Sequence, residues 1–135
     1  KIIIIIGNQD LTAGEKFAKY LYNSTPHITE NQKLLLKQYQ DKHNSKKIKA
    51  THVEPVSPDK SLDTGNRNFI ITGALALGKI DEVDKNCYWR LSGLLIKCIN
   101  EEFQTCNNLF QNPSLVTSMG TWGDETPIKP MKIMH

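Results

Sequence analysis

The sequence predicts a small domain of class α/β or α+β, with about three to four strands and a buried N-terminal strand covered by about three helices. A run of isoleucines at 2–6 predicts that strand, and an amphipathic stretch at 85–111 predicts the longest helix. The chain has 135 residues, of which 39% are hydrophobic and 23% charged. These values are typical of one globular domain, so we expect residues 1–135 to form a single domain.

The N-terminal segment predicts a strand followed by a helix. Every residue from 2 to 6 is β-branched, and no polar residue interrupts the run. Both faces of this strand should therefore be covered, and the middle of a sheet is the expected setting. Thr12 and Glu15 have the spacing of a capping box. An apolar stripe follows them at helical spacing, which predicts a helix at about 13–23.

The next segment predicts a second helix and a second strand. Leu35, Leu36 and Tyr39 would share one face of a helix at about 30–43. A second capping box precedes them. Moderate alternation of apolar and polar residues then predicts a strand at 47–53.

A long polar loop is expected at 54–68, because this stretch holds two prolines, a glycine and few apolar residues. The apolar run at 69–72 favours a third strand. A short buried helix is the alternative, since the period of so short a run cannot distinguish the two.

The C-terminal half predicts one long helix and an irregular tail. At 100° per residue, the apolar residues of 85–111 fall on one side, and Pro113 ends the helix. Residues 112–135 are rich in turn-forming residues and should be irregular, with Trp122 as their anchor.

The three cysteines, Cys87, Cys98 and Cys106, favour an intracellular protein. An odd number without a pairing rhythm is typical of reduced core residues, so a reducing, cytoplasmic compartment is expected. No apolar run reaches the roughly 18 residues of a membrane helix, so no membrane partner is expected. No metal-ligand spacing occurs among histidines and cysteines, and we expect no metal and no cofactor.

The first candidate site is the junction between the first strand and the first helix. A glycine after a buried strand, followed by a helix N-terminus, is the geometry that binds phosphate through free backbone N–H groups. The spacing fails the P-loop pattern, and an ordinary turn is the competing interpretation. The anion-binding candidates are Gly7, Asn8, Gln9, Asp10, Thr12 and Lys16.

The second candidate is a basic stretch that could neutralise phosphates without reading sequence. A solvated surface is the competing interpretation. Its members are Lys33, Lys37, Lys42, Lys46, Lys47 and Lys49. The third candidate is Glu102, which falls within the apolar arc of the 85–111 helix and would be a buried carboxylate.

No recognisable catalytic set occurs in the chain. The leading hypothesis is therefore a non-catalytic interaction module that binds a protein or a nucleic acid. A nucleotide- or phosphate-binding enzyme using the junction at 7–16 is the first alternative. The second is a structural or assembly subunit, in which residues 127–135 add an edge strand to a neighbour. Such a subunit could be viral or from a phage, since richness in Lys, Asn and Ile is associated with an AT-rich coding genome, such as that of a virus, a phage or a low-GC bacterium.

Overall fold

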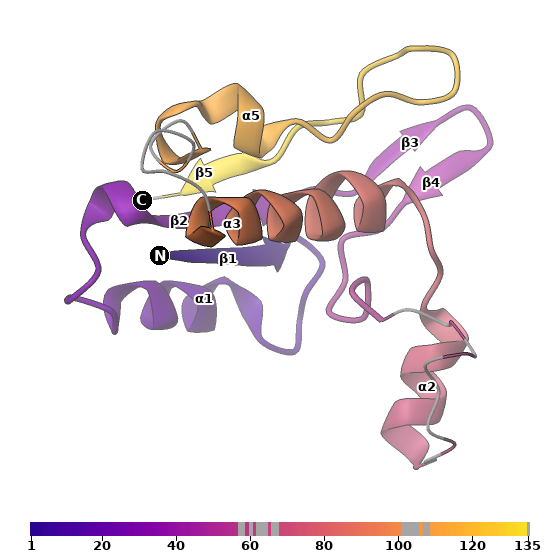
Figure 1. The fold of residues 1–135 in the computed structure, drawn as a ribbon. Helices are drawn as coiled ribbons and strands as arrows, with labels where there is room; N and C mark the ends of the chain where they lie inside the picture. Colours follow the sequence, from indigo (N-terminus) through magenta and orange to yellow (C-terminus); the bar gives the residue numbers. More distant parts are fainter. Residues whose placement is uncertain are drawn as a thin grey trace.

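The computed structural model describes residues 1–56, 59, 61, 65, 68–100, 106 and 109–134. It shows a small mixed α/β domain, as expected (Figure 1). Its elements are β1 (Ile2–Gly7), α1 (Gly14–Asn23), η1 (Glu30–Gln32), β2 (Lys33–Gln38), β3 (Asp41–His43), β4 (Lys46–Ile48), α2 (Phe69–Leu77), η3 (Asp84–Trp89), α3 (Arg90–Asn100), α5 (Pro113–Thr117) and β5 (Lys132–Met134).

The main sheet has three strands in the order β1-β2-β5. β1 and β2 are parallel and connected through α1, with Ile4 opposite Leu35. β5 joins the other side of β2 in antiparallel orientation. The expected position of β1 in the middle of the sheet is wrong, because β2 is the central strand and β1 lies at an edge of the described sheet.

The helix expected at 30–43 is also wrong. That segment forms the short helix η1 and then β2, in which Leu34, Leu35 and Leu36 are all buried. Three consecutive leucines cannot share one face of an amphipathic helix. In a strand covered on both sides, each of them reaches a core.

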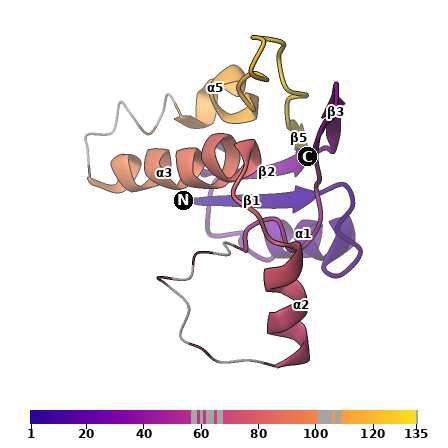
Figure 2. The ribbon, with the colours of Figure 1, turned by 90° about the vertical axis from the view of Figure 1, so that its right-hand side faces the viewer.

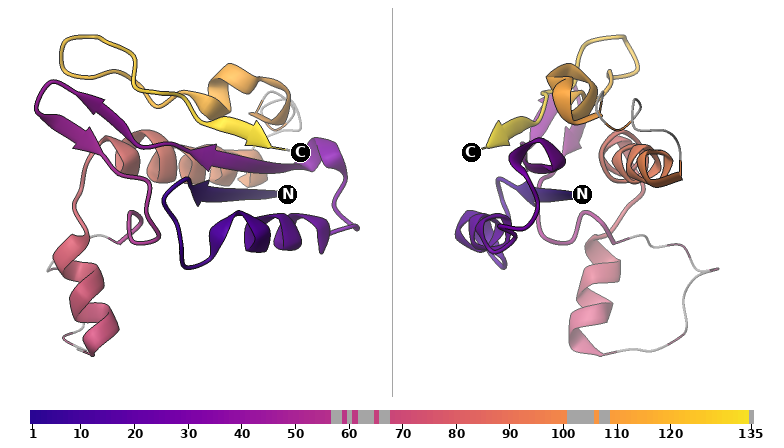
Figure 3. Two further views of the ribbon diagram at one scale, coloured as in Figure 1. Left: turned by 180° about the vertical axis from the view of Figure 1, so that it is seen from behind. Right: turned by 60° about the vertical axis from the view of Figure 1, so that its left-hand side comes forward.

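Both faces of β1 and β2 are covered, as the uninterrupted isoleucine run predicted. Ile3 and Ile5 pack against the larger core, which includes Leu36 and the apolar side of η3 and α3. Ile4 and Ile6 belong to the smaller core, which α1 completes with Ala18 and Tyr22. The two helices therefore cover opposite faces of the sheet (Figure 3).

The helix expected at 85–111 is confirmed as far as residue 100, where α3 ends. It begins as a π-helical turn, η3, and Cys87 and Leu91 are buried on its inner side. Residues 101–105, 107 and 108 lie outside the described residues. Pro113 occupies the first turn of α5, and β5 pairs with β2, so the tail expected to be irregular carries two further elements.

The expectation of three reduced cysteines is wrong for two of them. Cys98 and Cys106 form a disulfide, with their Cα atoms 4.6 Å apart. Cys87 is a free, buried thiol, as expected.

The disulfide is not typical of the reducing compartment that we expected, because such bonds persist mainly in oxidising environments. Of the helices that the structure describes, none has the length and apolar character needed to span a bilayer.

The middle of the chain differs most from expectation. β3 and β4 form a hairpin. The strand expected at 47–53 is shorter than expected: β4 covers Lys46–Ile48, and residues 49–53 are not in a strand. The segment at 69–72 is the start of helix α2, whose N-terminus is capped by Asn68: its Oδ1 accepts the N–H of Ile71 at 2.8 Å. The alternative of a short helix is thus confirmed, although this helix is not buried.

Candidate functional site

The loop between β1 and α1 holds a carboxylate at the helix N-terminus. Asp10 Oδ1 accepts the N–H groups of Thr12 and Ala13 at 2.9 and 3.0 Å. The expected capping box at Thr12 is wrong, because Ala13 is the N-cap and no side chain caps it. Glu15 instead contacts Lys37 at 2.7 Å.

The second oxygen of Asp10 contacts His52. Asp10 Oδ2 lies 3.0 Å from His52 Nδ1. Burial alone would raise the pKa of Asp10, but the hydrogen bonds from His52 and from two backbone N–H groups outweigh burial and lower it. The Asp10 carboxylate therefore stays ionised, and it accepts N–H groups before α1 that the anion-binding hypothesis assigned to a bound phosphate.

The backbone at this junction is tightly packed. Gln9 N–H donates to the carbonyl of Ala50 at 2.9 Å, and Asn8 N–H donates to that of Gln38 at 2.8 Å. A Cβ on Gly7 would come within 2.1 Å of the Ala50 oxygen. A cavity of about 210 Å³ includes Gly7 and Asp10 in its lining, but not the exposed Lys16. The anion-binding hypothesis remains a prediction, although the N–H groups of Asn8, Gln9, Asp10 and Thr12 already have acceptors within the chain.

The structure separates the predicted basic residues into two groups. Lys33 is buried, where it pairs with Glu30 at 3.2 Å and donates to the carbonyl of Tyr22. Lys37 pairs with Glu15. These two lysines contact groups within the domain, whereas Lys42, Lys46 and Lys47 lie exposed on the β3–β4 hairpin, followed by the half-buried Lys49.

The hairpin register brings like charges together. Lys42 lies directly opposite Lys47, and His43 lies opposite Lys46. Directly opposed lysines repel each other. Sequence reasoning missed this hairpin, although Asn44, at φ 52°, is a typical turn residue.

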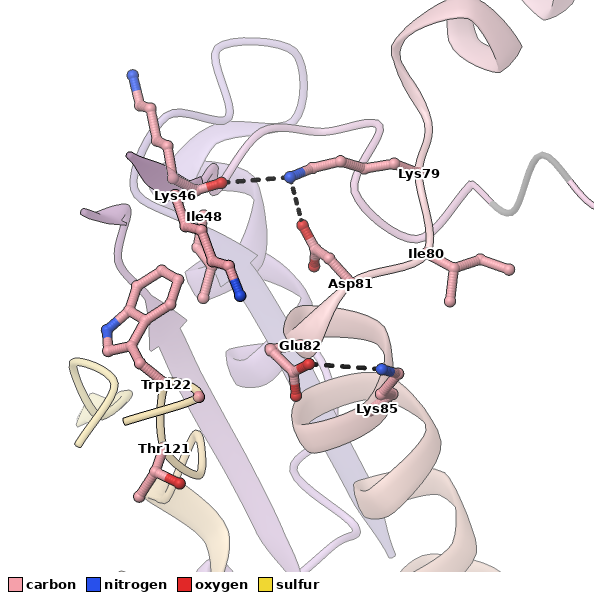
Figure 4. Close-up of a pocket in the computed structure, with 11 residues that line it drawn as sticks. Lys46, Ile48, Lys79, Ile80, Asp81, Glu82, Lys85, Thr121 and Trp122 are labelled. Atoms are coloured by element: carbon pink, nitrogen blue, oxygen red, sulfur yellow. Dashed lines mark hydrogen bonds and ion pairs between the residues drawn. The ribbon is translucent and has the colours of Figure 1, made fainter. Parts of the chain in front are cut away.

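Beside the hairpin is a cavity of about 420 Å³, which Figure 4 shows in close-up. We call it the lysine cavity. Its lining comes from β4, from the segment before and into η3, and from the loop before β5; it consists of Lys46, Lys47, Ile48, Lys79, Ile80, Asp81, Glu82, Lys85, Thr121, Trp122 and Gly123.

Trp122 anchors one wall of the lysine cavity, and its side chain is buried as expected. The ring of His43 stacks on it with centroids 5.8 Å apart. His43 Nε2 in turn contacts Asp124 Oδ2 at 2.6 Å. The indole therefore stacks on an imidazole that is oriented by its contact with Asp124.

Helix α2 is the most apolar exposed element that the structure describes. None of its nine residues is buried, and Phe69 and Ile70 are 94% and 77% exposed. Figures 1 and 2 show it projecting from the body of the domain. The C-terminal end of α2 contacts the rest of the domain. A Cβ added to its C-cap residue, Gly78, would come within 2.4 Å of the backbone oxygen of Val56.

Glu102, the predicted buried carboxylate, lies outside the described residues. The structure instead buries Glu54 and Asp84, neither of which was singled out from the sequence. Burial raises the pKa of both carboxyls. Asp84 follows Asp81 and Glu82 in an acidic cluster before a helix, a pattern that predicts exposure rather than burial.

Comparison with known proteins finds no matching family model, no similar curated protein and no similar solved structure. Among the described residues, no group of three or more His, Cys, Asp or Glu side chains could hold a metal ion. The functional argument therefore depends on the surfaces described above.

Proposed function

We propose that this protein is an interaction module that binds a partner protein through helix α2. The observation that carries the proposal is the exposure of α2, an apolar helix without a buried residue. Exposed large side chains such as Phe69 and Ile70 each forgo about 1.5–3 kcal/mol of burial free energy. Contiguous apolar surface of this kind is typical of interaction sites.

The composition of α2 favours a groove on a protein as the binding site. A helix that is apolar on every side needs cover all round, and residues 69–77 contain no charged side chain. Nine residues span about 14 Å, a length typical of helices that bind in grooves. At Gly73 an added Cβ would meet nothing within 4 Å, so a partner can approach the helix backbone closely.

Contacts just after the C-terminus of α2 attach the helix to the rest of the domain and leave its side chains accessible to a partner. Just after the helix, Lys79 Nζ donates to the carbonyl of Lys47 at 3.2 Å and pairs with Asp81 at 2.7 Å. These contacts fix the segment that follows Gly78. The helix is thus held at one end while its apolar side chains stay exposed.

The first part of the test asks whether α2 is exposed in solution. The chain and its Phe69→Ser/Ile70→Ser variant are compared by binding of an apolar fluorescent dye and by hydrogen exchange of 69–77. We expect dye binding that the variant loses. A matched control, Leu11→Ser, changes a residue that is 96% exposed in a loop and should retain dye binding. Slow exchange together with no dye binding would show α2 packed on its own domain, which contradicts the proposal.

The second part asks what binds. A protein retained from the source cells by the chain but not by the variant is purified and titrated by calorimetry. We expect at least a tenfold loss of affinity in the variant. Equal affinity of both forms would overturn the proposal. The proposal would also be overturned if the chain bound no protein but floated with phospholipid vesicles in a way that depends on α2. The apolar surface of α2 would then bind a membrane.

A further inference from the structure

We propose that the lysine cavity binds a small phosphate-bearing molecule with an apolar or aromatic body, such as a mononucleotide. Three segments that are far apart in sequence meet at this cavity: the β3–β4 hairpin, residues 79–85 and residues 121–123 (Figure 4). A volume of about 420 Å³ lies within the range of small-molecule sites. The proposal does not depend on α2, which does not line the cavity.

The charges around the cavity favour an anion. Four lysines and two acidic residues are among the lining residues, so the lining has a formal net charge of +2. Lys79 pairs with Asp81 at 2.7 Å, and Lys85 lies 3.4 Å from Glu82. Throughout the part of the chain that the structure describes, the ammonium groups of Lys46 and Lys47 have no hydrogen-bond or ion-pair partner.

The hairpin itself supports the same conclusion. Lys46 and Ile48 are two positions apart in β4, so their side chains lie on the same face of the hairpin, and Lys46 Nζ would lie 3.9 Å from a Cβ on Gly123, another lining residue. Lys79 adds a cation in a fixed position, because its Nζ is held between Asp81 and the carbonyl of Lys47. Little side-chain entropy is then lost when a ligand binds to Lys79.

The remaining lining residues indicate that the ligand is more than a bare phosphate. Ile48, Ile80 and Trp122 are apolar lining residues, and Ile80 is the most exposed of the three. Trp122 is held in place by the stacked ring of His43. Lysines act as point charges toward phosphate oxygens, while apolar walls accommodate a base or another flat group.

Fluorescence of Trp122 provides the test. The chain has two tryptophans, so the Trp89→Phe variant leaves Trp122 as the single reporter. This variant is titrated with ATP, AMP, pyrophosphate and adenosine at two salt concentrations, with calorimetry in parallel. We expect saturable signals with ATP and AMP that weaken with salt, competition by pyrophosphate, and no binding of adenosine alone.

Charge variants then locate the site. Lys46→Gln/Lys47→Gln should weaken ATP binding at least tenfold. The control Lys97→Gln/Lys132→Gln removes the same charge from exposed positions outside the cavity and should retain the affinity. Thermal unfolding checks that each variant is folded, and the two single variants replace the double one if it is not.

Three results would overturn the proposal. One is the absence of any signal with millimolar ATP, AMP or pyrophosphate. Another is equal affinity of the cavity variant and the parent. The last is binding of an oligothymidylate by a chain that binds no mononucleotide, which would indicate a nucleic-acid surface. The Phe69→Ser/Ile70→Ser variant should bind ATP normally, so failure here is distinct from failure of the α2 proposal.

Discussion

The imidazole of His43 contacts the carboxylate of Asp124 across 81 positions of sequence, at 2.6 Å. This contact holds the turn before β5 against the β3–β4 hairpin. The hydrogen bond with His43 lowers the pKa of Asp124 to about 2, more than burial raises it.

This pair predicts a specific pH dependence. Because the folded-state pKa of Asp124 is below its unfolded value, its contribution to stability is present above about pH 4 and lost as the pH falls toward 2. In His43→Ala, an NMR titration of the Asp124 carboxyl should show its pKa returning toward 3.8. An unchanged pKa would contradict the assignment of this contact as its cause.

Glu54 should have the opposite effect. Burial raises its pKa, and the nearby charge of Asp81 adds to this shift. A raised folded-state pKa means that Glu54 destabilises the fold as the pH rises through that value. Calorimetry should therefore show a higher melting temperature for Glu54→Gln at pH 7–8, and a smaller difference at pH 4. Glu125→Gln changes an exposed carboxylate and should show neither effect.

Two glycine substitutions should have opposite signs. Gly7→Ala places a methyl group 2.1 Å from the Ala50 oxygen and should cost about 1–3 kcal/mol of unfolding free energy. Gly73→Ala lies in helix α2 with open space around it and should add about 0.5–1 kcal/mol if α2 unfolds with the domain. Urea denaturation measures both. A neutral Gly7→Ala would contradict the close approach of these two segments.

The disulfide should contribute measurably to stability. Replacing Cys98 and Cys106 by Ser removes a short loop closure, with an expected cost of about 2–3 kcal/mol. A thiol reductant should destabilise the parent chain by a similar amount and leave the double variant unchanged. Peptide mapping without reduction tests the pairing directly, and a Cys87-containing linkage would contradict it.

Much of the fold could be predicted where one strong pattern acts alone. The isoleucine run predicted β1 and the cover on both of its faces, and apolar periodicity predicted α1 and the helix through residue 100. β2 was missed because Leu35, Leu36 and Tyr39 fit a helical face, whereas parallel pairing with β1 decided the outcome. That pairing is a long-range interaction which no local pattern reports.

The candidate sites show the same division. Lys46 and Lys47 could be selected from sequence because they belong to a local basic stretch. Lys79 and Trp122, which complete the lysine cavity, come from distant segments that only the folded chain brings together. The exposure of α2 was missed because an apolar run normally predicts a core element, and burial depends on what packs around it.

The Cys98–Cys106 bond also determines how the chain responds to proteases. A single cut anywhere between these two residues would leave the N-terminal and C-terminal products joined through sulfur. A gel run without reductant would then show an intact band, and reduction would reveal two fragments. Nicking in this segment would thus go unnoticed in an oxidising environment and become visible only on transfer to a reducing one.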